Sequence, residues 1–403
     1  MQWRWLSMMM LVSCGGASPK PVVPKSNVNV SSTITDVPKG TPKAASATSS
    51  KPAVVTHSKV VVTQISVNGD ATCARLADAT VRCWGDNSFN VISPILSGAL
   101  ENHLFPSPVA IADLPRVAQV VVVEASACAR LEDGTVRCWG TDDGTLGLGS
   151  PLPPGPPPST DKPMPVLKLQ GVEDLSGHSH LCALFADASV SCWHDYDSGN
   201  GDPRDKGSRA PVVVPGFANA VQIADGGSIS CARLVSGKVR CWRDVSPSLI
   251  PRGKVRPDAY DVAGLGKDID ALFVGYSNGC AITKTHEIRC FGDVPFEHPP
   301  TSNNRVSYPL KIASDVRSMA ISYDLACVIV GSGDVLCDKT DYSKAHHPTK
   351  VEGITGAVAI AVGGDHACAL DKVGVVWCWG SNDKGQLGDG TYADRTTAAT
   401  VLF

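Results

Sequence analysis

Pairs of cysteines ten positions apart recur seven times along this chain. The pairs are Cys73 and Cys83, Cys128 and Cys138, Cys182 and Cys192, Cys231 and Cys241, Cys280 and Cys290, Cys327 and Cys337, and Cys368 and Cys378. The most complete copy of the surrounding sequence runs from Val358 to Thr391, and one further cysteine, Cys14, lies outside the series. A fixed internal period is typical of repeat architectures, whose core grows by adding units. The 403 residues therefore need not divide into separate globular domains.

The spacing of ten fits a β-hairpin in which the two cysteines face each other. Opposed residues have position numbers with a constant sum, so an even separation requires a loop with an odd number of residues. In the common three-residue loop the third residue is left-handed, and here it lies six positions after the first cysteine. Gly occupies that position in four units, and Ala79, Ala188 and His286 replace it in the others. We predict one disulfide per unit; buried free thiols are the alternative, and zinc is less favoured because the spacing is not CxxC.

Each unit contains four short β-rich runs: one before the first cysteine, one around each cysteine, and a fourth after a connection of variable length. The fourth runs are 108–111, 165–169, 211–214, 260–262, 309–312, 348–351 and 399–402. About 50 residues per unit is the size of a propeller blade. The sequence therefore predicts an all-β fold, a seven-bladed β-propeller of four-stranded antiparallel blades over residues 54–403. The expected repeats are approximately 60–112, 113–169, 170–214, 215–263, 264–312, 313–352 and 353–403.

The last unit carries three specific motifs, Gly363 to Leu370, Cys378-Trp379-Gly380, and Gly385 to Thr391. In these motifs the unit resembles the repeat of the regulator of chromosome condensation family, which implies a seven-bladed propeller over Val60 to Phe403. Elsewhere the pattern is weaker. The residue after the second cysteine is Trp in most other units, but it is Phe291 and Asp338 in two of them. The best-known member of that family is a nucleotide exchange factor for a small GTPase on chromatin. We do not expect that role in an exported chain.

Export is expected from the N-terminus. Residues 1–13 resemble a short signal peptide, and Leu11-Val12-Ser13-Cys14 resembles the lipobox of bacterial lipoproteins, which implies lipidation of Cys14. Gly15 follows, and in that family a residue other than Asp favours the outer membrane. Residues 14–53 are rich in Ser, Thr, Pro and Lys without aromatics, which predicts a disordered tether. An ordinary secretory signal is the alternative.

The long connections between the third and fourth strands fall at one point of the unit, so a closed ring gathers them on one face. They are 87–107, 141–164, 194–210, 243–258, 293–307 and 339–347. Loops on a rigid scaffold are the usual binding surface. We name Tyr196, Phe296 and Tyr342 as candidate partner-binding aromatics, with packing on the blade edge as the alternative.

Three histidines in the third unit form a candidate metal site. With cysteines at 182 and 192, His180 opposes His194, and His178 lies two residues along on the same side. Imidazoles at this spacing suit zinc, copper or nickel. Because His366 occupies the position of His180 in the last unit, a structural role for His180 is the simpler interpretation.

No catalytic motif is recognisable. The formal net charge is −3, and residues 1–53 hold six basic residues against Asp36 alone, which leaves −8 on the rest and disfavours nucleic acid as a partner. We therefore expect a monomeric, non-enzymatic binding or scaffolding propeller at the bacterial cell envelope, without a cofactor, that binds a protein partner. The alternatives are an inhibitor of an envelope or secreted protease or β-lactamase, a propeller hydrolase or lyase, and a glycan-binding adhesin.

Overall fold

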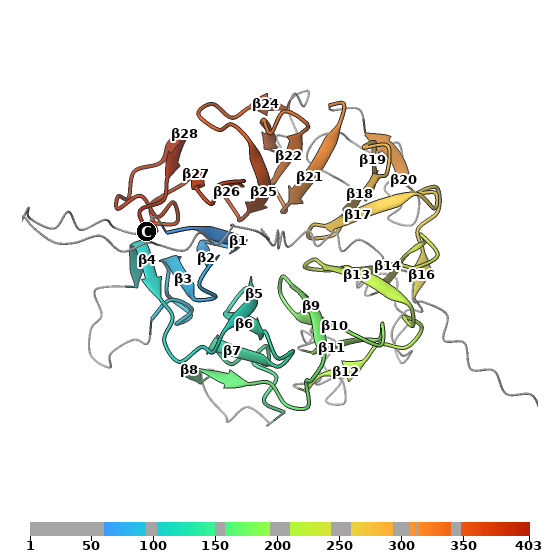
Figure 1. Ribbon diagram of the computed structural model, residues 1–403, viewed down its shortest axis with the longest axis horizontal. Helices are drawn as coiled ribbons and strands as arrows, with labels where there is room; N and C mark the ends of the chain where they lie inside the picture. Colours follow the sequence, from blue (N-terminus) through green and yellow to red (C-terminus); the bar gives the residue numbers. More distant parts are fainter. Residues whose placement is uncertain are drawn as a thin grey trace, which may run out of the picture.

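The computed structural model is a ring of seven four-stranded antiparallel sheets, the blades of a propeller (Figure 1). The structure describes residues 60–93, 103–149, 158–193, 210–242, 259–292, 307–310, 313–339 and 348–403. In each blade the strands follow one another in chain order, from strand A nearest the axis to strand D at the rim. The predicted all-β propeller of seven blades is confirmed.

The strands recur in four sets. The A strands are β1 (Val62–Asn68), β5 (Val117–Val122), β9 (Val172–Gly177), β13 (Ala220–Asp225), β17 (Ile269–Val274), β21 (Val316–Ile321) and β25 (Ala357–Val362). The B strands are β2 (Ala71–Leu76), β6 (Ser126–Leu131), β10 (Leu181–Phe185), β14 (Ser230–Leu234), β18 (Gly279–Thr283), β22 (Leu325–Val330) and β26 (His366–Asp371). The C strands are β3 (Val81–Asp86), β7 (Val136–Thr141), β11 (Val190–Trp193), β15 (Val239–Trp242), β19 (Ile288–Phe291), β23 (Val335–Lys339) and β27 (Val376–Gly380). The D strands are β4 (Leu104–Ala110), β8 (Ser159–Pro165), β12 (Val212–Val213), β16 (Tyr260–Asp261), β20 (Ser307–Leu310), β24 (Thr349–Lys350) and β28 (Arg395–Thr400). In the described ranges no helix has the length and apolar character needed to cross a bilayer.

The turn between strands B and C sets the register of every blade. Its third residue has a positive φ in all seven blades, including Ala79 at 68°, Ala188 at 65° and His286 at 62°. The two cysteines of each blade are consequently direct partners across strands B and C, and they form the seven predicted disulfides. The prediction of one disulfide per blade is confirmed.

Some D strands begin earlier than the sequence predicts. In blades 1, 2 and 7 they start at Leu104, Ser159 and Arg395, several residues before the expected runs. In these blades strand C continues through a glycine two positions after the second cysteine, as at Gly380 with φ 109°. At this glycine the register between strands C and D shifts, and the two strands then pair again. A Cβ on Gly380 would lie 2.3 Å from the Asp365 carbonyl oxygen, so this continuation requires glycine.

The ring closes without exchanging a strand. β28 pairs with β27 of its own blade, so the terminal run does not cross to the first blade. Instead the Val62 amide donates to the carbonyl of Gly374, the left-handed turn residue of blade 7, at 3.1 Å. The first residue of strand A makes the same bond to the preceding blade at five other seams, for example Val117 to Ala79 at 2.9 Å. The closing seam is therefore equivalent to the others.

Side-chain amides extend the backbone ladder across three seams. Gln64 Nε2 donates to the Val120 carbonyl and Gln64 Oε1 accepts from the Val120 amide, both at 2.9 Å. Gln119 and Gln222 make the same paired bonds to the next blade. Because all three amides are buried and satisfied, they fix the spacing of neighbouring A strands.

The tryptophan after the second cysteine joins its blade to the preceding one. Trp84 Nε1 donates to the Gln386 carbonyl at 2.9 Å across the closing seam, and Trp139 and Trp193 bond in the same way to connections in blades 1 and 2. Gly388, with φ 66°, lets the blade 7 connection lie flat on the indole, since a Cβ there would come within 2.7 Å of Trp84 Nε1.

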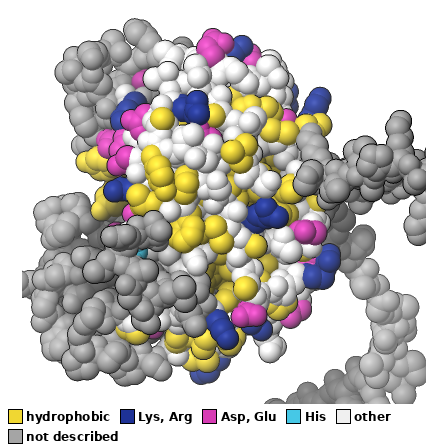
Figure 2. Space-filling model, turned by 90° about the vertical axis from the view of Figure 1, so that its left-hand side faces the viewer, with side chains coloured by type: hydrophobic (Ala, Val, Ile, Leu, Met, Phe, Trp, Pro, Cys, Tyr) yellow, Lys and Arg dark blue, Asp and Glu magenta, His cyan; other side chains and the backbone are white. Residues whose placement is uncertain are grey.

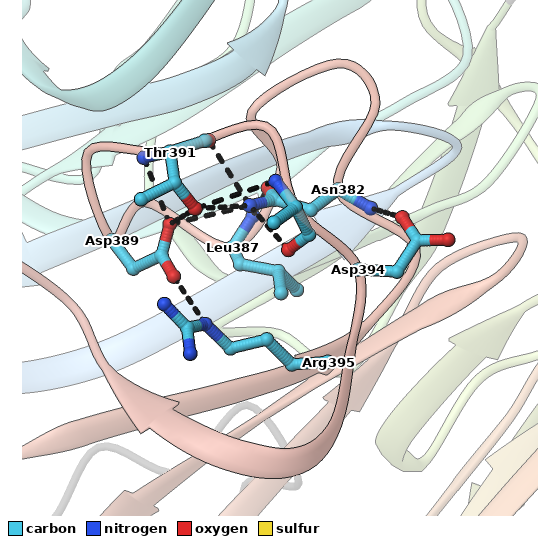
Figure 3. Close-up of polar contacts among 7 residues, drawn as sticks. Asn382, Leu387, Asp389, Thr391, Asp394 and Arg395 are labelled. Atoms are coloured by element: carbon cyan, nitrogen blue, oxygen red, sulfur yellow. Dashed lines mark hydrogen bonds and ion pairs between the residues drawn. The ribbon is translucent and has the colours of Figure 1, made fainter.

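That blade 7 connection, residues 381–394, is organised around Asn382 (Figure 3). The side-chain nitrogen of Asn382, Nδ2, donates to Asp389 Oδ1 and to the carbonyls of Thr391 and Ala393. Its side-chain oxygen, Oδ1, accepts from the backbone amide of Leu387 at 3.0 Å. Leu387 is thereby held in the core between blades 7 and 1. The motif Gly385-Gln386-Leu387-Gly388 is thus a structural element of the closing seam.

The hydrogen bond of the Trp84 indole at this seam can be tested by comparison with Trp242. Trp242 is equally buried, but its Nε1 makes no hydrogen bond within the described residues. Trp84→Phe and Trp242→Phe both lose ring volume, whereas Trp84→Phe also removes a buried hydrogen bond. We expect Trp84→Phe to be less stable than Trp242→Phe by about 1–2 kcal/mol in denaturant unfolding. Equal losses would show that the indole bond does not stabilise the closure.

Candidate functional site

The A–B turns and the C–D connections lie on one face of the ring, which we call the insertion face. Strand direction alternates, so both connections leave the blade at the same end. Backbone bonds confirm it: the Asp86 amide at the end of β3 donates to the Asp70 carbonyl, and Ser381 after β27 donates to Asp365, both at 3.0 Å. The B–C turns and the connections between blades lie on the opposite face.

Most of the long connections lie outside the described residues. Tyr196, Phe296 and Tyr342, the aromatics named from the sequence, fall there, as do His194 and Cys14. Their assignments stay predictions. The part of the insertion face that the structure does describe comprises the A–B turns around the mouth of the central channel and parts of the C–D connections of blades 1, 2 and 7.

The channel encloses a cavity of about 180 Å³ bordered by the A strands. Its lining differs from one side to the other. Blades 1, 3 and 4 contribute polar residues, Ser66, Asn68, Asp174, Ser176, His178 and Asp225, and blades 5 to 7 contribute apolar ones, Phe273, Val274, Met319, Ile321, Ile360 and Val362. The cavity matches one side chain rather than a cofactor in size.

Three rings form an arc on the A–B turns around the mouth. The rings of His178 and Tyr276 are 6.1 Å apart, and those of Tyr276 and Tyr323 are 5.6 Å apart, both edge to face. The arc crosses blade 4 over Gly227, where a Cβ would lie 2.2 Å from the Tyr276 ring. Tyr276 and Tyr323 remain 41% and 59% exposed. Exposed tyrosines at a rigid rim are suited to contact a partner.

His180 lies in a buried polar cluster between blades 3 and 4. Its Nε2 contacts Asp225 Oδ1 and is 2.8 Å from Ser230 Oγ, which in turn donates to Asp225 Oδ1 at 2.5 Å. A catalytic triad needs Ser and Asp on different nitrogens of the histidine. Here both lie at Nε2 and Ser230 is fully buried, so the cluster joins two blades and is not arranged for nucleophilic catalysis.

The same cluster bears on the metal prediction. His180, Cys182 and Asp225 are close enough together to share an ion, but the Cys182 sulfur is committed to its disulfide. That leaves His180 and Asp225 as candidate ligands, with His178 on the adjacent turn. The predicted set of His178, His180 and His194 stays a prediction, because His194 is outside the described residues.

His366 is the counterpart of His180 at the closing seam. Its Nε2 lies 3.0 Å from Thr72 Oγ1 of blade 1, and its ring packs on Gly363, where a Cβ would come within 2.8 Å. Burial lowers the pKa of the His366 imidazole from 6.5 to about 4, although Asp365 opposes that shift. A buried, neutral histidine therefore lies at the seam where the ring closes.

Known proteins share this architecture. A model of the regulator of chromosome condensation (RCC1) repeat matches residues 62–90 and 357–386. Yeast RCC1 (Prp20), solved bound to Kap60, superimposes with a TM-score of 0.66 at 17% identity over 91% of each chain. Human WBSCR16 gives 0.65 at 16% identity, covering 80% of this chain and 95% of that one.

Two of the seven units, in blades 1 and 7, match the RCC1 repeat, and the complete ring has the fold of the RCC1 propellers. The E3 ubiquitin-protein ligase HERC2 of mouse is 24% identical in an alignment of 350 residues that covers 80% of this chain. This chain spans only 7% of the length of that ligase and of its human counterpart. These similarities establish the propeller and leave its partner to be inferred from its own residues.

Sequence reasoning missed the tyrosine arc. The signal is available once the units are aligned, because His178, Tyr276 and Tyr323 all stand four positions before the first cysteine of their unit. Asp225 similarly stands at a position that is apolar or Ser in the other six units. Both positions lie outside the long connections, where the binding residues were expected.

The buried histidine predicts acid sensitivity. The pKa of His366 is lower in the folded state than the unfolded value of 6.5, so its stabilising contribution is complete above pH 6.5 and is lost as pH falls towards about 4. The loss reaches up to about 3 kcal/mol. We expect His366→Gln to be less stable than the wild type at pH 7. Its melting temperature should fall less than that of the wild type between pH 6.5 and 4.

The control is His286→Asn, which changes a half-exposed histidine at a left-handed position that Asn tolerates. Because this ring is not buried, the replacement should change the acid slope of the melting curve much less than His366→Gln does. The same slope in the wild type and in His366→Gln would contradict the assignment.

Proposed function

We propose that this protein is a non-enzymatic binding module that is displayed at the cell envelope by a lipid anchor on Cys14 and holds a protein partner on its insertion face. The observation that carries the proposal is the arc of exposed tyrosines, Tyr276 and Tyr323, at the channel mouth of a disulfide-stapled ring. A rigid scaffold presents such residues at little entropic cost.

Two further features support binding over catalysis. Within the described residues, the one Ser, His and Asp grouping is buried and arranged to join two blades. The yeast propeller Prp20 is described by its binding to Gsp1p and histones, so a related ring serves as a binding protein. With 19% identity, that likeness supports the fold, and the partner is a separate question.

The envelope location is supported by the N-terminal sequence and by the disulfides. Leu11-Val12-Ser13-Cys14 precedes a long segment rich in Ser, Pro and Lys. Disulfides persist in exported proteins and are rare in the reducing cytosol. A ring with one disulfide per blade is therefore consistent with an exported protein.

Site-specific photo-crosslinking tests the binding face. A photoreactive phenylalanine at Tyr323 should capture a discrete partner in cells of the source organism. The same group at Val373, which is 51% exposed on the opposite face, should not. Tyr276→Ala in the background of the position-323 crosslinker should reduce capture several-fold. Equal capture from both faces, or none at position 323, would contradict the proposal.

The anchor is tested separately by Cys14→Ser. We expect the wild type to incorporate labelled fatty acid and to fractionate with membranes, since acyl chains supply the attachment. The variant should lose the label and appear in the soluble fraction, with its seven disulfides intact by mass. Membrane fractionation of the unlabelled variant would rule out the lipid anchor as the means of attachment.

A further inference from the structure

The insertion face has an excess of negative charge in the part of the chain that the structure describes. The seven A–B turns carry Asp70, Glu124, Asp324 and Asp365 and no Lys or Arg. Nine of the ten described arginines lie at the opposite end of the blades, and the exception is Arg395. The described arginines are therefore concentrated at the opposite end of the blades, and the described part of the insertion face is left with a net negative charge.

The few cations on the described part of this face are already paired with carboxylates. Lys339 pairs with Asp365 at 2.6 Å, Arg395 pairs with Asp389, and Lys384 lies 3.9 Å from Asp383. No ion pair joins Glu124 or Asp324 to a basic side chain in the described ranges. Glu124 and Asp324 thus present charge to solvent that no described basic side chain compensates.

Crowding among these carboxylates is detectable in Asp70. Burial raises the pKa of its carboxyl group, and Asp86, Asp383 and Asp365 raise it further, with Lys384 opposing them. Like charges this close favour an added cation. The repulsion lies at the closing seam, between the first and seventh blades.

Exposed aromatic rings gather on the same face. In the described ranges the aromatic side chains with large exposure are Phe89, Tyr276, Tyr323 and Tyr392, and all four lie in A–B turns or C–D connections. The opposite face exposes aliphatic residues instead, such as Val235 and Val373. The rim over blades 1 and 7 mixes apolar, acidic and basic side chains without such a separation (Figure 2).

We infer that the insertion face docks a cationic protein segment, one rich in Arg or Lys. The inference rests on the proposed binding function and names the class of partner. Carboxylates pair with the basic groups, and the tyrosine rings contact guanidinium or ammonium groups through cation–π interactions. The same charge repels phosphate backbones, so nucleic acid and anionic membranes are disfavoured occupants.

Binding of a simple cationic probe tests this inference on the full-length protein. The probe is a fluorescein-labelled peptide of alternating Arg and Gly, measured by anisotropy. Affinity should fall by about tenfold or more between about 50 and about 200 mM NaCl, because the contact is largely electrostatic. A peptide of alternating Glu and Gly should not bind.

Two double variants separate the face from the net charge. Glu124→Gln with Asp383→Asn neutralises two exposed carboxylates on the insertion face, and Glu287→Gln with Glu352→Gln does the same on the opposite face. Both raise the net charge equally. We expect about five- to tenfold weaker peptide binding for the first pair and less than about twofold for the second. Tyr323→Ala, which changes no charge, should weaken binding about threefold or more.

The outcomes are decisive in either direction. Equal weakening by the two double variants, or no effect of Tyr323→Ala, would show binding by net charge alone and overturn the inference. A partner captured at position 323 whose binding resists both salt and the first double variant would overturn it while leaving the proposed function intact. Unchanged melting temperatures of all variants confirm that the comparison is between folded proteins.

Discussion

The structure depends most on the left-handed residue of the B–C turn. Its positive φ fixes a three-residue loop, which places the two cysteines opposite each other and allows the disulfide. At six of the seven seams its carbonyl also accepts a hydrogen bond from the backbone amide of the first residue of strand A in the next blade. One backbone conformation thus determines both the register within a blade and the contact between blades, including the contact that closes the ring.

This position shows what could be predicted from the sequence. The spacing of the cysteines determined the loop length, so the turn, the register and the disulfides followed from hairpin geometry even where Ala79, Ala188 and His286 replace glycine. Those features are local. The early starts of β4, β8 and β28 were missed because they depend on Gly85, Gly140 and Gly380 bending strand C, and strand propensity does not register that bend.

Contacts between blades were the harder part to predict. The Gln64 bridge and the Trp84 bond join residues that are 56 and 302 positions apart, and both depend on the distance between neighbouring blades. The candidate site was only partly anticipated for the same reason. The insertion face follows from topology, whereas the arc from His178 to Tyr323 forms only when turns of three separate blades meet around the channel.

The resulting molecule has two unlike faces. The opposite face and the strand ends beside it hold almost all described arginines, and several are used internally, as Arg75 bonds the Val117 carbonyl. The insertion face holds the uncompensated carboxylates and the exposed tyrosines. The disulfides within the blades and the hydrogen bonds across the seams hold the two faces in a fixed arrangement.

Carboxyl footprinting of the protein in cells of its source organism tests the central claim most directly. A carbodiimide with a neutral amine labels exposed carboxylates, and mass spectrometry reports the extent at each residue. The account predicts that Glu124 and Asp324 are protected when the partner is present, whereas Glu287 and Glu352 on the opposite face label equally with and without it. Equal labelling of both faces, or protection confined to the opposite face, would contradict it.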